Sequence, residues 1–322
     1  MLERRAGDQP QDEARRNQLQ APFFPERDGR DGKIAMERML ITGANGLLGR
    51  EIADRFRGEY ELLAIDFAEC DVTRPADCRR VIGDFRPAVV VHCAAYTAVD
   101  RAEEEEAKAL AVNRDGTRNV ARECREHGAL VVTFGTDYIF DGSSSRPYAE
   151  DDPASPLSAY GRSKWEAEEA LRTEAPDHLL IRSQWLFGPY GRNFIFAVLD
   201  RAGRGEPLRV VSDQRGCPTY ARDLAAAAKR LLDAGARGTF HFSNEGEATW
   251  YDLAAFVLSR AVPGPVSLSP ARTAELSYPA PRPLYSVLGK GKYRKATGEV
   301  PRRWEEAVTE FLKTMRERGN VG

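Results

Sequence analysis

Tyr160 and Lys164 stand four positions apart in the segment SAYGRSK, residues 158–164. If this segment begins a helix, the two side chains project from the same face. A neighbouring ammonium group favours the phenolate of a tyrosine and lowers its pKa from about 10, which would suit a proton donor at neutral pH. The spacing alone is a weak signal, because such a pair arises by chance about 0.3 times in a chain of this composition, and most are surface contacts.

Thr136 supplies a third polar group, at the end of the aliphatic run ALVVTFGT (129–136). We expect this run to be a strand, which places Thr136 at the edge where open α/β sheets bind ligands. The three residues suit the reduction of a carbonyl group. Hydride addition from a nicotinamide makes an alkoxide, so an acid must supply a proton and a hydroxyl should hold the oxygen. We therefore predict Thr136, Tyr160 and Lys164 as catalytic residues, with Lys164 also donating to the nicotinamide ribose.

A glycine-rich stretch, ITGANGLLGREI (41–52), lies between the first expected strand and its helix. Glycines at this place let the chain turn tightly and bring backbone N–H groups against a pyrophosphate. The N-terminus of the following helix adds partial positive charge. A glycine-rich turn alone is a weak signal, but its position in the first βα unit strengthens it. The stretch predicts a cofactor site that includes Gly43, Asn45, Gly46 and Leu47.

An acidic residue, Asp66 in ELLAIDF, ends the next expected strand. A carboxylate here can accept hydrogen bonds from both ribose hydroxyls of an adenosine, whereas it would repel a 2′-phosphate unless an arginine lay nearby. Asp66 therefore favours NADH over NADPH. Asp71, in the CDVT that follows, is placed to contact adenine, and capping of the helix after Thr73 is an equally good role for it.

These groups depend on a regular order of elements. From Met39 onward, the aliphatic runs MLIT, ELLAID, AVVVHCAA and ALVVTFGT alternate with helical or irregular segments. Such runs indicate a parallel sheet covered on both faces. The predicted fold class is α/β, a doubly wound parallel sheet of the Rossmann type with a smaller C-terminal substrate-binding lobe. The segment between Thr136 and Ala159 is too long for an ordinary connection and is a candidate binding or lid loop.

We divide the chain into three parts. Residues 1–36 are rich in charge and proline and poor in aliphatic residues. They are predicted to be a disordered tail, or an extension before a real start at Met36 or Met39. Residues 37–182 form the predicted dinucleotide-binding domain. Residues 183–322 form mainly the substrate-binding lobe, with some elements returning to the Rossmann sheet.

Composition narrows the class of protein. The net charge of −2 favours neither nucleic acid nor an anionic membrane as the main partner. The five cysteines form no C-x-x-C pair and the four histidines form no ligand cluster, which argues for reduced thiols and against a structural zinc site. No apolar run reaches the ~18 residues of a membrane span, and the hydrophobic centre of a signal peptide is missing. A cytoplasmic protein is expected.

The chain from Met39 to Leu312 resembles the extended short-chain dehydrogenase/reductases, and within them the dTDP-4-dehydrorhamnose reductases. Besides the glycine turn and YGRSK, the motifs that carry the resemblance are CAAYTAVDRAE (93–103), GTDYIFDG (135–142), RSQWLFG (182–188), NF (193–194), DQRGCPTYARDLA (213–225), TWYDLA (249–254) and RPLYSVL (282–288). The implied activity is reduction, with NADH or NADPH, of the C4 ketone of a nucleotide-linked 4-keto-6-deoxysugar, most simply dTDP-4-dehydro-L-rhamnose.

The resemblance also implies roles position by position. Besides the catalytic three, it implies that Ala94, Ala95 and Tyr96 line the cofactor. The residues that it implies for the nucleotide-sugar substrate are Val99, Asp137, Tyr138, Trp185, Asn193, Gln214, Gly216, Pro218, Thr219 and Arg282. The indole of Trp185 suits the methyl edge of a deoxysugar, with core packing as the alternative for Trp185 and Tyr138. Arg282 is suited to the substrate pyrophosphate by its bidentate donors.

Three positions, Arg215, Cys217 and Tyr285, depart from the usual pattern of the subfamily. All three fall in the substrate half, so a sibling reductase acting on a different nucleotide sugar is one alternative. Another is a non-catalytic dinucleotide-binding protein that resembles the regulatory subunit of methionine adenosyltransferase, although the intact catalytic residues argue against it.

Two further properties come from the resemblance alone. Relatives are often homodimers, and the amphipathic helices expected near residues 100–127 and 159–173 are candidates for pairing. Some relatives are thought to bridge subunits with Mg²⁺ through carboxylates. Glu51 alone is too little to support a metal site, so metal use stays open.

Overall fold

The computed structural model describes residues 36–319. The predicted disordered tail, or extension before a later start, covers residues 1–36. Of these residues, only Met36 is described. Within them, no helix combines the length and the apolar character that crossing a membrane would need.

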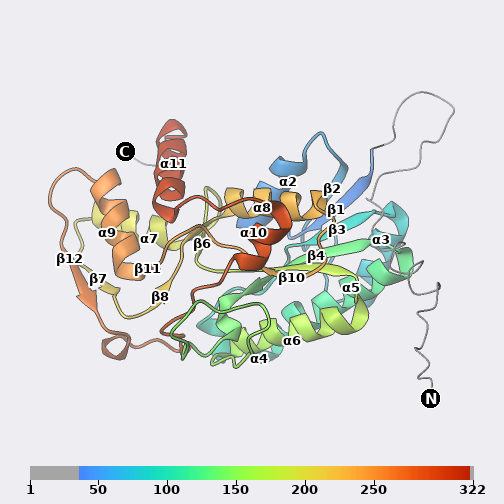
Figure 1. Cartoon of the computed structure of the whole chain (residues 1–322), viewed down its shortest axis with the longest axis horizontal. Coiled ribbons are helices and arrows are strands. Elements are labelled where there is room, and N and C mark those ends of the chain that lie inside the picture. The colour runs from blue at the N-terminus through green and yellow to red at the C-terminus, as the bar shows by residue number, and fades with distance from the viewer. Residues whose placement is uncertain (1–35, 320–322) are drawn as a thin grey trace, which may run out of the picture. The chain divides into compact units, whose positions relative to one another are not determined.

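A six-stranded sheet runs through the structure, and all of its strands are parallel (Figure 1). Its order is β2-β1-β3-β4-β5-β10. The strands are β1 (Arg38–Thr42), β2 (Glu61–Ile65), β3 (Val89–His92), β4 (Leu130–Thr136), β5 (His178–Ser183) and β10 (Gly238–His241). Every residue of β3 and β5 is buried, as expected for strands covered on both faces. The predicted doubly wound parallel sheet is confirmed.

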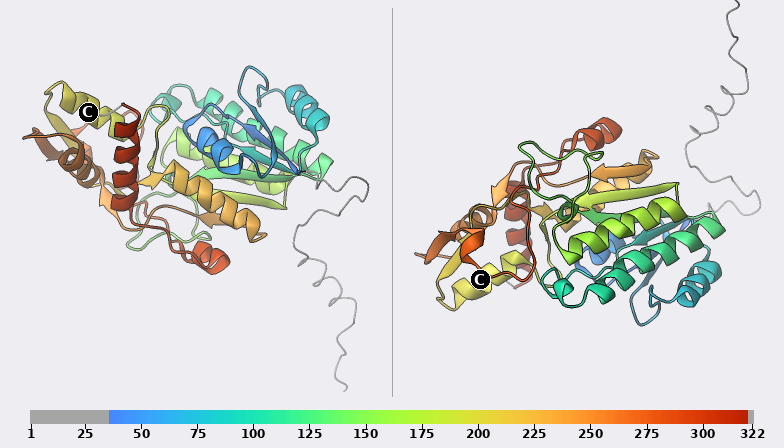
Figure 2. Two further views of the ribbon diagram at one scale, coloured as in Figure 1. Left: turned by 90° about the horizontal axis from the view of Figure 1, so that it is seen from above. Right: turned by 90° about the horizontal axis from the view of Figure 1, so that it is seen from below.

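Helices cover both faces of this sheet (Figure 2). One face carries α2 (Leu47–Phe56), α8 (Ala221–Asp233) and α10 (Gly291–Thr297). The other carries α3 (Pro75–Phe85), α5 (Gly116–His127) and α6 (Ala159–Glu174). Successive side chains of a strand point to opposite faces, so β1 contributes to two separate cores. Met39 and Ile41 lie in the first core and Leu40 lies in the second.

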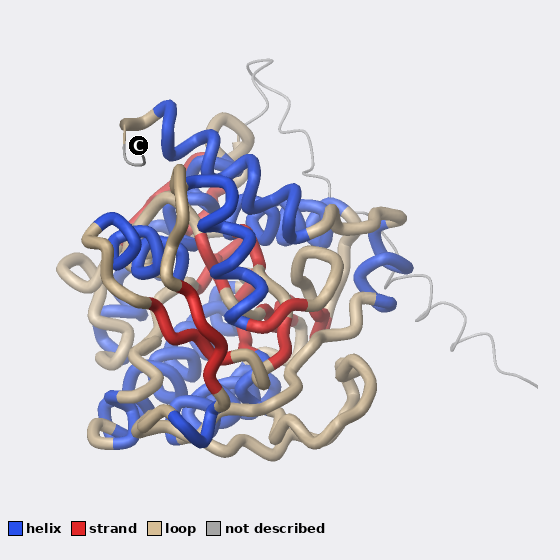
Figure 3. Tube along the Cα trace, turned by 90° about the vertical axis from the view of Figure 1, so that its left-hand side faces the viewer, coloured by secondary structure: helices blue, strands red, loops and turns tan. Residues whose placement is uncertain are grey.

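The remaining elements form a smaller lobe, which faces the viewer in Figure 3. Its helices are α7 (Phe194–Gly203), α9 (Trp250–Ala261) and α11 (Trp304–Glu317). Its strands are β6 (Leu186–Phe187), β7 (Leu208–Val211), β8 (Arg215–Gly216), β9 (Thr219–Tyr220), β11 (Ala248–Thr249) and β12 (Leu268–Ala271). The lobe has its own core around Val257, Val308 and Phe311. The second half of the chain thus builds the lobe and also supplies β10, α8 and α10 to the main sheet and its covering layer.

Short helical segments complete the description. They are α4 (Glu106–Leu110), a π-helical turn (Ala111–Asp115) and the 3₁₀ turns Arg101–Glu103, Asp137–Ile139 and Thr273–Glu275. Helix α6, which carries Tyr160 and Lys164, starts at a defined N-cap. The Ser158 side chain accepts a hydrogen bond from the backbone N–H of Gly161 at 3.1 Å.

The long segment before α6 is anchored rather than free. The Tyr148 N–H donates to the Val287 carbonyl at 2.8 Å, and the Gly289 N–H donates to the Tyr148 carbonyl at 2.7 Å. The Tyr148 ring stacks on Phe140, with ring centroids 4.1 Å apart. The candidate lid loop is therefore pinned along its middle to the chain near residues 287–289, and its first residues, beginning at Asp137, stay beside the end of β4.

Candidate active site

A cavity of about 640 Å³ lies at the carboxyl ends of strands β3, β4 and β5. Its walls are the glycine turn, these strand ends, the start of α6 and aromatic residues of the lobe. The sequence-predicted residues that it brings together are Gly43, Gly46, Leu47, Ala94, Ala95, Val99, Thr136, Asp137, Tyr138, Tyr160, Lys164 and Trp185. Residues predicted for the cofactor, the chemistry and the sugar thus share one cavity.

The glycine turn has the compactness that a pyrophosphate site requires. Gly43 has a φ of +66°, and a Cβ there would lie 2.6 Å from the backbone nitrogen of Ala94. A Cβ on Gly49 would lie 2.2 Å from the carbonyl oxygen of Gly43. Because only glycine tolerates both contacts, the turn can bring the N-terminus of α2 to the cavity wall. This geometry fits the cofactor role predicted for the turn.

Asp66 lies beside this turn. Its Oδ2 accepts a hydrogen bond from the Asn45 N–H at 2.9 Å, and its Oδ1 accepts one from the Phe67 N–H at 2.8 Å. Arg50 Nε donates to the carbonyl of the same Asn45 at 3.1 Å. A carboxylate and a guanidinium group therefore both reach Asn45, at the end of the turn where the adenosine ribose is predicted.

Asp71 and Tyr96 make their own contacts outside the cavity wall. Asp71 Oδ1 accepts hydrogen bonds from the N–H and the hydroxyl of Thr73, at 3.0 Å and 2.7 Å. These contacts form a turn before α3, whose N-cap is Arg74 and has no side-chain cap hydrogen bond, so the alternative role of Asp71 as the cap of that helix is not met. The Tyr96 hydroxyl donates to Glu105 Oε2 at 2.8 Å. Neither Asp71 nor Tyr96 lines the cavity, so their predicted cofactor contacts stay predictions.

Thr136, Tyr160 and Lys164 meet at the cavity wall. Thr136 is the last residue of β4, and the other two lie in the first turns of α6. Lys164 Nζ donates to the Phe134 carbonyl at 2.8 Å, which holds the ammonium group beside β4. All three residues line this cavity, and Thr136 lies close enough to Tyr160 to affect its pKa. The arrangement lets the three groups act on one carbonyl oxygen bound there.

Burial dominates the acid–base properties of this pair. Burial raises the pKa of Tyr160 to about 12, and the nearby Thr136 side chain opposes the rise. Burial also lowers the pKa of Lys164 to about 8, against the negative charge of Glu168. The expected lowering of the Tyr160 pKa by Lys164 is not met, because burial disfavours the phenolate and Thr136, not Lys164, is the group that opposes the rise. Tyr160 is thus a protonated phenol at neutral pH.

Asp137, which follows Thr136, is buried, with 1% of its surface exposed. Its Oδ2 accepts a hydrogen bond from Ser286 Oγ at 2.6 Å, and its Oδ1 accepts one from Thr136 Oγ1 at 3.2 Å. Burial raises the pKa of Asp137 to about 7, although both hydroxyls favour the carboxylate. Sequence reasoning missed Ser286, whose only signal was its place in RPLYSVL.

Asn113 is a second residue that sequence reasoning missed. Its side chain accepts a hydrogen bond from the Tyr96 N–H at 2.8 Å and donates to the Tyr96 carbonyl at 3.1 Å. It also donates to Ser163 Oγ at 2.9 Å, and Ser163 Oγ donates to the Tyr160 carbonyl at 2.8 Å. Asn113 therefore ties the segment after β3 to the helix that carries the predicted acid. It lies in the π-helical turn, where the usual helical periodicity gives no signal.

A second cavity, of about 340 Å³, shares part of its wall with the first, since Tyr138, Phe194 and Trp250 line both. Its polar lining includes Gln214 and Arg282, which were predicted for the substrate, and Arg201 and Arg209, which were not predicted. Three guanidinium groups in one cavity suit a ligand with several negative charges.

Trp185 is held in an uncommon backbone conformation, with a φ of +48°. Its indole stacks on Trp250, with ring centroids 3.7 Å apart and an interplanar angle of 10°. A Cβ on Gly216 would lie 2.6 Å from the Trp185 ring, so this glycine permits the close approach. Gly216 therefore touches Trp185 rather than the cavity. Backbone strain of this kind gathers at functional sites.

Three other residues predicted for the substrate line neither cavity. Asn193 is the N-cap of α7: its Oδ1 accepts a hydrogen bond from the Phe196 N–H at 3.2 Å. Thr219 and Pro218 are buried, and the Thr219 N–H donates to the Trp185 carbonyl at 3.1 Å. In the structure these residues shape the segments around Trp185, and their direct contacts with substrate stay predictions.

The three departures from the subfamily pattern also lie outside both cavities. The Tyr285 hydroxyl donates to Glu247 Oε1 at 3.1 Å, and Arg215 Nη1 lies 3.9 Å from Glu247 Oε2. Cys217 is buried, with its Sγ 2.8 Å from the Asn244 carbonyl oxygen. Any influence of these residues on substrate choice would act through their neighbours.

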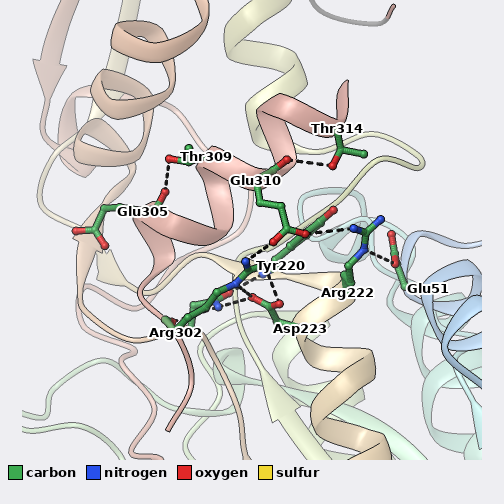
Figure 4. Close-up of polar contacts among 10 residues, drawn as sticks. Glu51, Tyr220, Arg222, Asp223, Arg302, Glu305, Thr309, Glu310 and Thr314 are labelled. Atoms are coloured by element: carbon green, nitrogen blue, oxygen red, sulfur yellow. Dashed lines mark hydrogen bonds and ion pairs between the residues drawn. The ribbon is translucent and has the colours of Figure 1, made fainter. Parts of the chain in front are cut away.

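Glu51, the carboxylate considered for a metal, has an arginine partner (Figure 4). Its Oε2 lies 3.6 Å from Arg222 Nε, and Arg222 Nη1 lies 3.2 Å from Glu310 Oε1 of α11. Burial raises the pKa of Glu51, although Arg222 opposes the rise. Across residues 36–319, no group of three or more His, Cys, Asp or Glu side chains is arranged to hold a metal ion.

Known proteins with similar sequences and structures point to one family. The family described as "RmlD substrate binding domain" matches residues 36–317. The chain is 44% identical over 282 residues to the probable dTDP-4,6-dihydroxy-2-methyloxan-3-one 4-ketoreductase of Streptomyces antibioticus, covering 85% of this chain and 94% of that protein. It is 39% identical over 285 residues to the dTDP-4-dehydrorhamnose reductase of Streptomyces griseus, covering 86% and 94%. The structure of dTDP-4-dehydrorhamnose reductase from Bacillus anthracis in complex with NADP has a TM-score of 0.84 at 34% identity, covering 87% of this chain and 99% of that one.

Proposed function

The chain belongs to the RmlD substrate-binding family, and from this premise we propose that it reduces the C4 ketone of dTDP-4-dehydro-L-rhamnose to give dTDP-L-rhamnose. At the level that its relatives share, it is an NAD(P)-dependent dTDP-sugar reductase. One observation carries the proposal: Thr136, Tyr160 and Lys164 line the same cavity as the glycine turn and Trp185.

The residues of the chain account for the proton and the charge in this reaction. A dinucleotide held at the glycine turn would supply the hydride that reduces C4 of the sugar. As negative charge grows on the former ketone oxygen, the phenol of Tyr160 donates its proton to that oxygen. The Thr136 hydroxyl, next to Tyr160, hydrogen-bonds the same oxygen. Lys164, held beside the Phe134 carbonyl, stabilises the phenolate that Tyr160 becomes.

We assign the nucleotide half of the substrate to the smaller cavity. Tyr138 and Trp250 belong to both cavities, so one ligand can extend from the first into the second. Arg201, Arg209 and Arg282 line the smaller one. Each pairs with a carboxylate, of Glu206, Glu275 and Asp100 respectively, and their guanidinium groups can also bind a pyrophosphate. The aromatic residues that line both cavities suit the apolar edge of a deoxysugar and the face of a base.

We propose NADH as the preferred cofactor. The Asp66 carboxylate, held at the end of the glycine turn, can accept hydrogen bonds from ribose hydroxyls. Arg50 contacts the same residue, Asn45, and provides positive charge for a 2′-phosphate. NADPH is therefore expected to serve as the weaker of two usable cofactors.

The test follows the absorbance of NADH and of NADPH with the purified protein and dTDP-4-dehydro-L-rhamnose, generated in situ by the preceding epimerase. Oxidation of both cofactors, faster with NADH, is the expected result. If both cofactors bind but neither is oxidised, the proposed reaction is wrong, and the non-catalytic dinucleotide-binding alternative gains support.

A second candidate is a sibling reductase that acts on another dTDP-linked ketosugar. It is favoured by the 44% identity to the Streptomyces antibioticus protein, whose name gives a different sugar from that of the rhamnose enzymes. The rates on that sugar and on dTDP-4-dehydro-L-rhamnose, with UDP- and GDP-linked ketosugars as further substrates, separate the two candidates.

A further inference from the structure

Nine buried side-chain atoms have no hydrogen-bond partner within residues 36–319, and three of them belong to residues that line the larger cavity. These three are His92 Nε2, Ser183 Oγ and Gln184 Nε2. The three residues are 2%, 8% and 3% exposed. A buried donor or acceptor without a partner costs free energy, and native proteins seldom leave one unpaired. Three at one cavity indicate contacts that are completed by what the cavity binds.

Gln184 carries the most information, because the orientation of its amide is determined. Its Oε1 accepts a hydrogen bond from the backbone N–H of Cys217 at 3.1 Å. A backbone N–H can only donate, so the oxygen must face Cys217 and the NH₂ group must face away from it. The group without a partner is therefore a donor, and its ligand must offer an acceptor.

The side chain is also fixed in place. A Cβ on Gly216 would lie 2.9 Å from Gln184 Oε1, which shows how closely the backbone at Gly216 packs against the amide. The next residue, Trp185, packs on the same glycine. Gln184 is 3% exposed, so its side chain is already ordered before a ligand binds. Binding then costs little side-chain entropy, which favours a hydrogen bond from this preorganised donor.

The position of Gln184 puts this donor at the reacting end of the cavity. The residue before it, Ser183, is the Cα partner of Thr136 in the pairing of β4 with β5. Gln184 is thus the first residue beyond the strand end next to Thr136, and Trp185 follows it. Under the proposed function, the reactants expected at this edge are the nicotinamide half of the cofactor and the sugar, because Thr136 and Trp185 flank it.

We propose that Gln184 is a further binding residue, whose Nε2 donates a hydrogen bond to an uncharged oxygen of the bound reactants. That oxygen is the carboxamide or ribose oxygen of the nicotinamide half, or a hydroxyl or ring oxygen of the deoxysugar. The inference rests on the proposed function, since it takes the ligands of the cavity from it. Ser183 and His92 are the other lining residues of this cavity with an unpartnered polar atom.

Two variants test the donor. Gln184→Met keeps the length of the side chain and removes all of its hydrogen bonds. Gln184→Glu keeps an oxygen for the Cys217 N–H and replaces the donor with a carboxyl group, which can donate only when it is protonated. Cys217→Ala is the matched control, because it changes the same contact region but keeps the backbone N–H and lines neither cavity.

The measurement is equilibrium binding of two probes, NADH and dTDP-L-rhamnose, across a range of pH. We expect Gln184→Met to weaken one of them by roughly five- to tenfold at every pH. Gln184→Glu should show a similar loss at high pH that disappears at low pH, since the protonated carboxyl again donates. Cys217→Ala should bind both probes as the wild type does. Weaker NADH binding places the acceptor on the cofactor, and weaker dTDP-L-rhamnose binding places it on the sugar.

The proposal is overturned if neither probe loses affinity, which would mean that a bound water satisfies the amide. It is also overturned if Gln184→Glu loses as much affinity at low pH as at high pH, because a protonated carboxyl would restore the donor. Binding needs no turnover, so a failure of the reductase assay would reject the proposed function without deciding this question. If the wild type does not bind dTDP-L-rhamnose, unchanged NADH binding in both variants overturns the assignment.

Discussion

Asp100 and Arg282, 182 positions apart in the sequence, form an ion pair in which Arg282 Nη2 lies 2.8 Å from Asp100 Oδ2. Nη1 of the same guanidinium group donates to the Ala280 carbonyl at 2.9 Å, and the group lies over the Tyr278 ring at 4.1 Å. These contacts hold Arg282 in the wall of the smaller cavity. The pair therefore joins the segment after β3 to the last third of the chain at the proposed pyrophosphate site.

Asp100→Asn should weaken binding of the substrate and leave binding of the cofactor unchanged. The Asp100 side chain is 40% exposed, so the ion pair itself contributes little stability. Its loss lets Arg282 leave its bound orientation, and we expect KM for the dTDP-sugar to rise by roughly fivefold. The NADH dissociation constant, measured by fluorescence titration, should stay unchanged. An equal loss of NADH affinity would contradict this, since it would mean general damage to the cavity.

Tyr160→Phe should remove the proton donor without removing the site. Because general acid catalysis is typically worth 10²–10⁴-fold, we expect kcat to fall by roughly that factor. NADH binding should change less than about threefold, since the aromatic ring is kept. Tyr251→Phe on α9 is the matched control, because it makes the same chemical change at a residue that lines neither cavity. A Tyr160→Phe enzyme with the wild-type rate would rule out Tyr160 as the acid.

Asp137 should make stability depend on pH in a direction opposite to that of a salt-bridged aspartate. The folded protein keeps the Asp137 proton up to about pH 7, whereas an unfolded chain releases it near 3.8. Between these values the folded state binds the extra proton, so the contribution of Asp137 to the free energy of unfolding falls as pH rises. Asp137→Asn has no such proton. Relative to the wild type, it should gain about 2 kcal/mol between about pH 5 and about pH 8.

Urea unfolding at several pH values measures this difference, and the other titrating groups cancel in the comparison. Ser286→Ala is the informative second variant. The Ser286 hydroxyl stabilises the Asp137 carboxylate, so its removal should raise the pKa further and extend the loss of stability to higher pH. The contrary result is that the free energies of unfolding of the wild type and Asp137→Asn differ by the same amount at every pH. That result would show that Asp137 is already ionised at neutral pH.

Asp66→Ala should change the choice of cofactor. Loss of the carboxylate removes the acceptor for the ribose hydroxyls and the repulsion of a 2′-phosphate, while Arg50 remains. We expect KM for NADH to rise by about tenfold and KM for NADPH to fall. Asp71→Ala should leave the ratio of the two KM values unchanged, because any adenine contact is common to both cofactors. A ratio that does not move in Asp66→Ala would place the ribose elsewhere.

Local patterns were enough for the parts of the site that neighbours in the chain determine. Gly43 needs its positive φ for a turn that the glycine spacing already indicated. Tyr160 and Lys164 share a helix face because they are four residues apart, and Thr136 ends a strand that its aliphatic run had predicted. In each case the backbone geometry of a single element decides the outcome.

The features that were missed join distant positions or depend on the whole fold. Ser286 reaches Asp137 across 149 positions, and Asn113 reaches Ser163 across 50. Neither pair follows from a period or a motif, because only the packed topology brings them together. The direction of the Tyr160 pKa shift failed for a related reason. It depends on how much water the folded chain removes from the phenol, which the residues near Tyr160 in the sequence do not reveal.

The place of β10 in the sheet has a consequence for synthesis of the protein. β10 (Gly238–His241) pairs with β5 (His178–Ser183), so α7, several lobe strands and α8 must be translated between two adjacent strands. Until β10 emerges from the ribosome, β5 presents an edge of unpaired backbone N–H and C=O groups, which is a template for pairing with another chain. We expect nascent chains halted before Gly238 to aggregate or to depend on chaperones more than chains that extend beyond His241, in which β5 is paired on both sides.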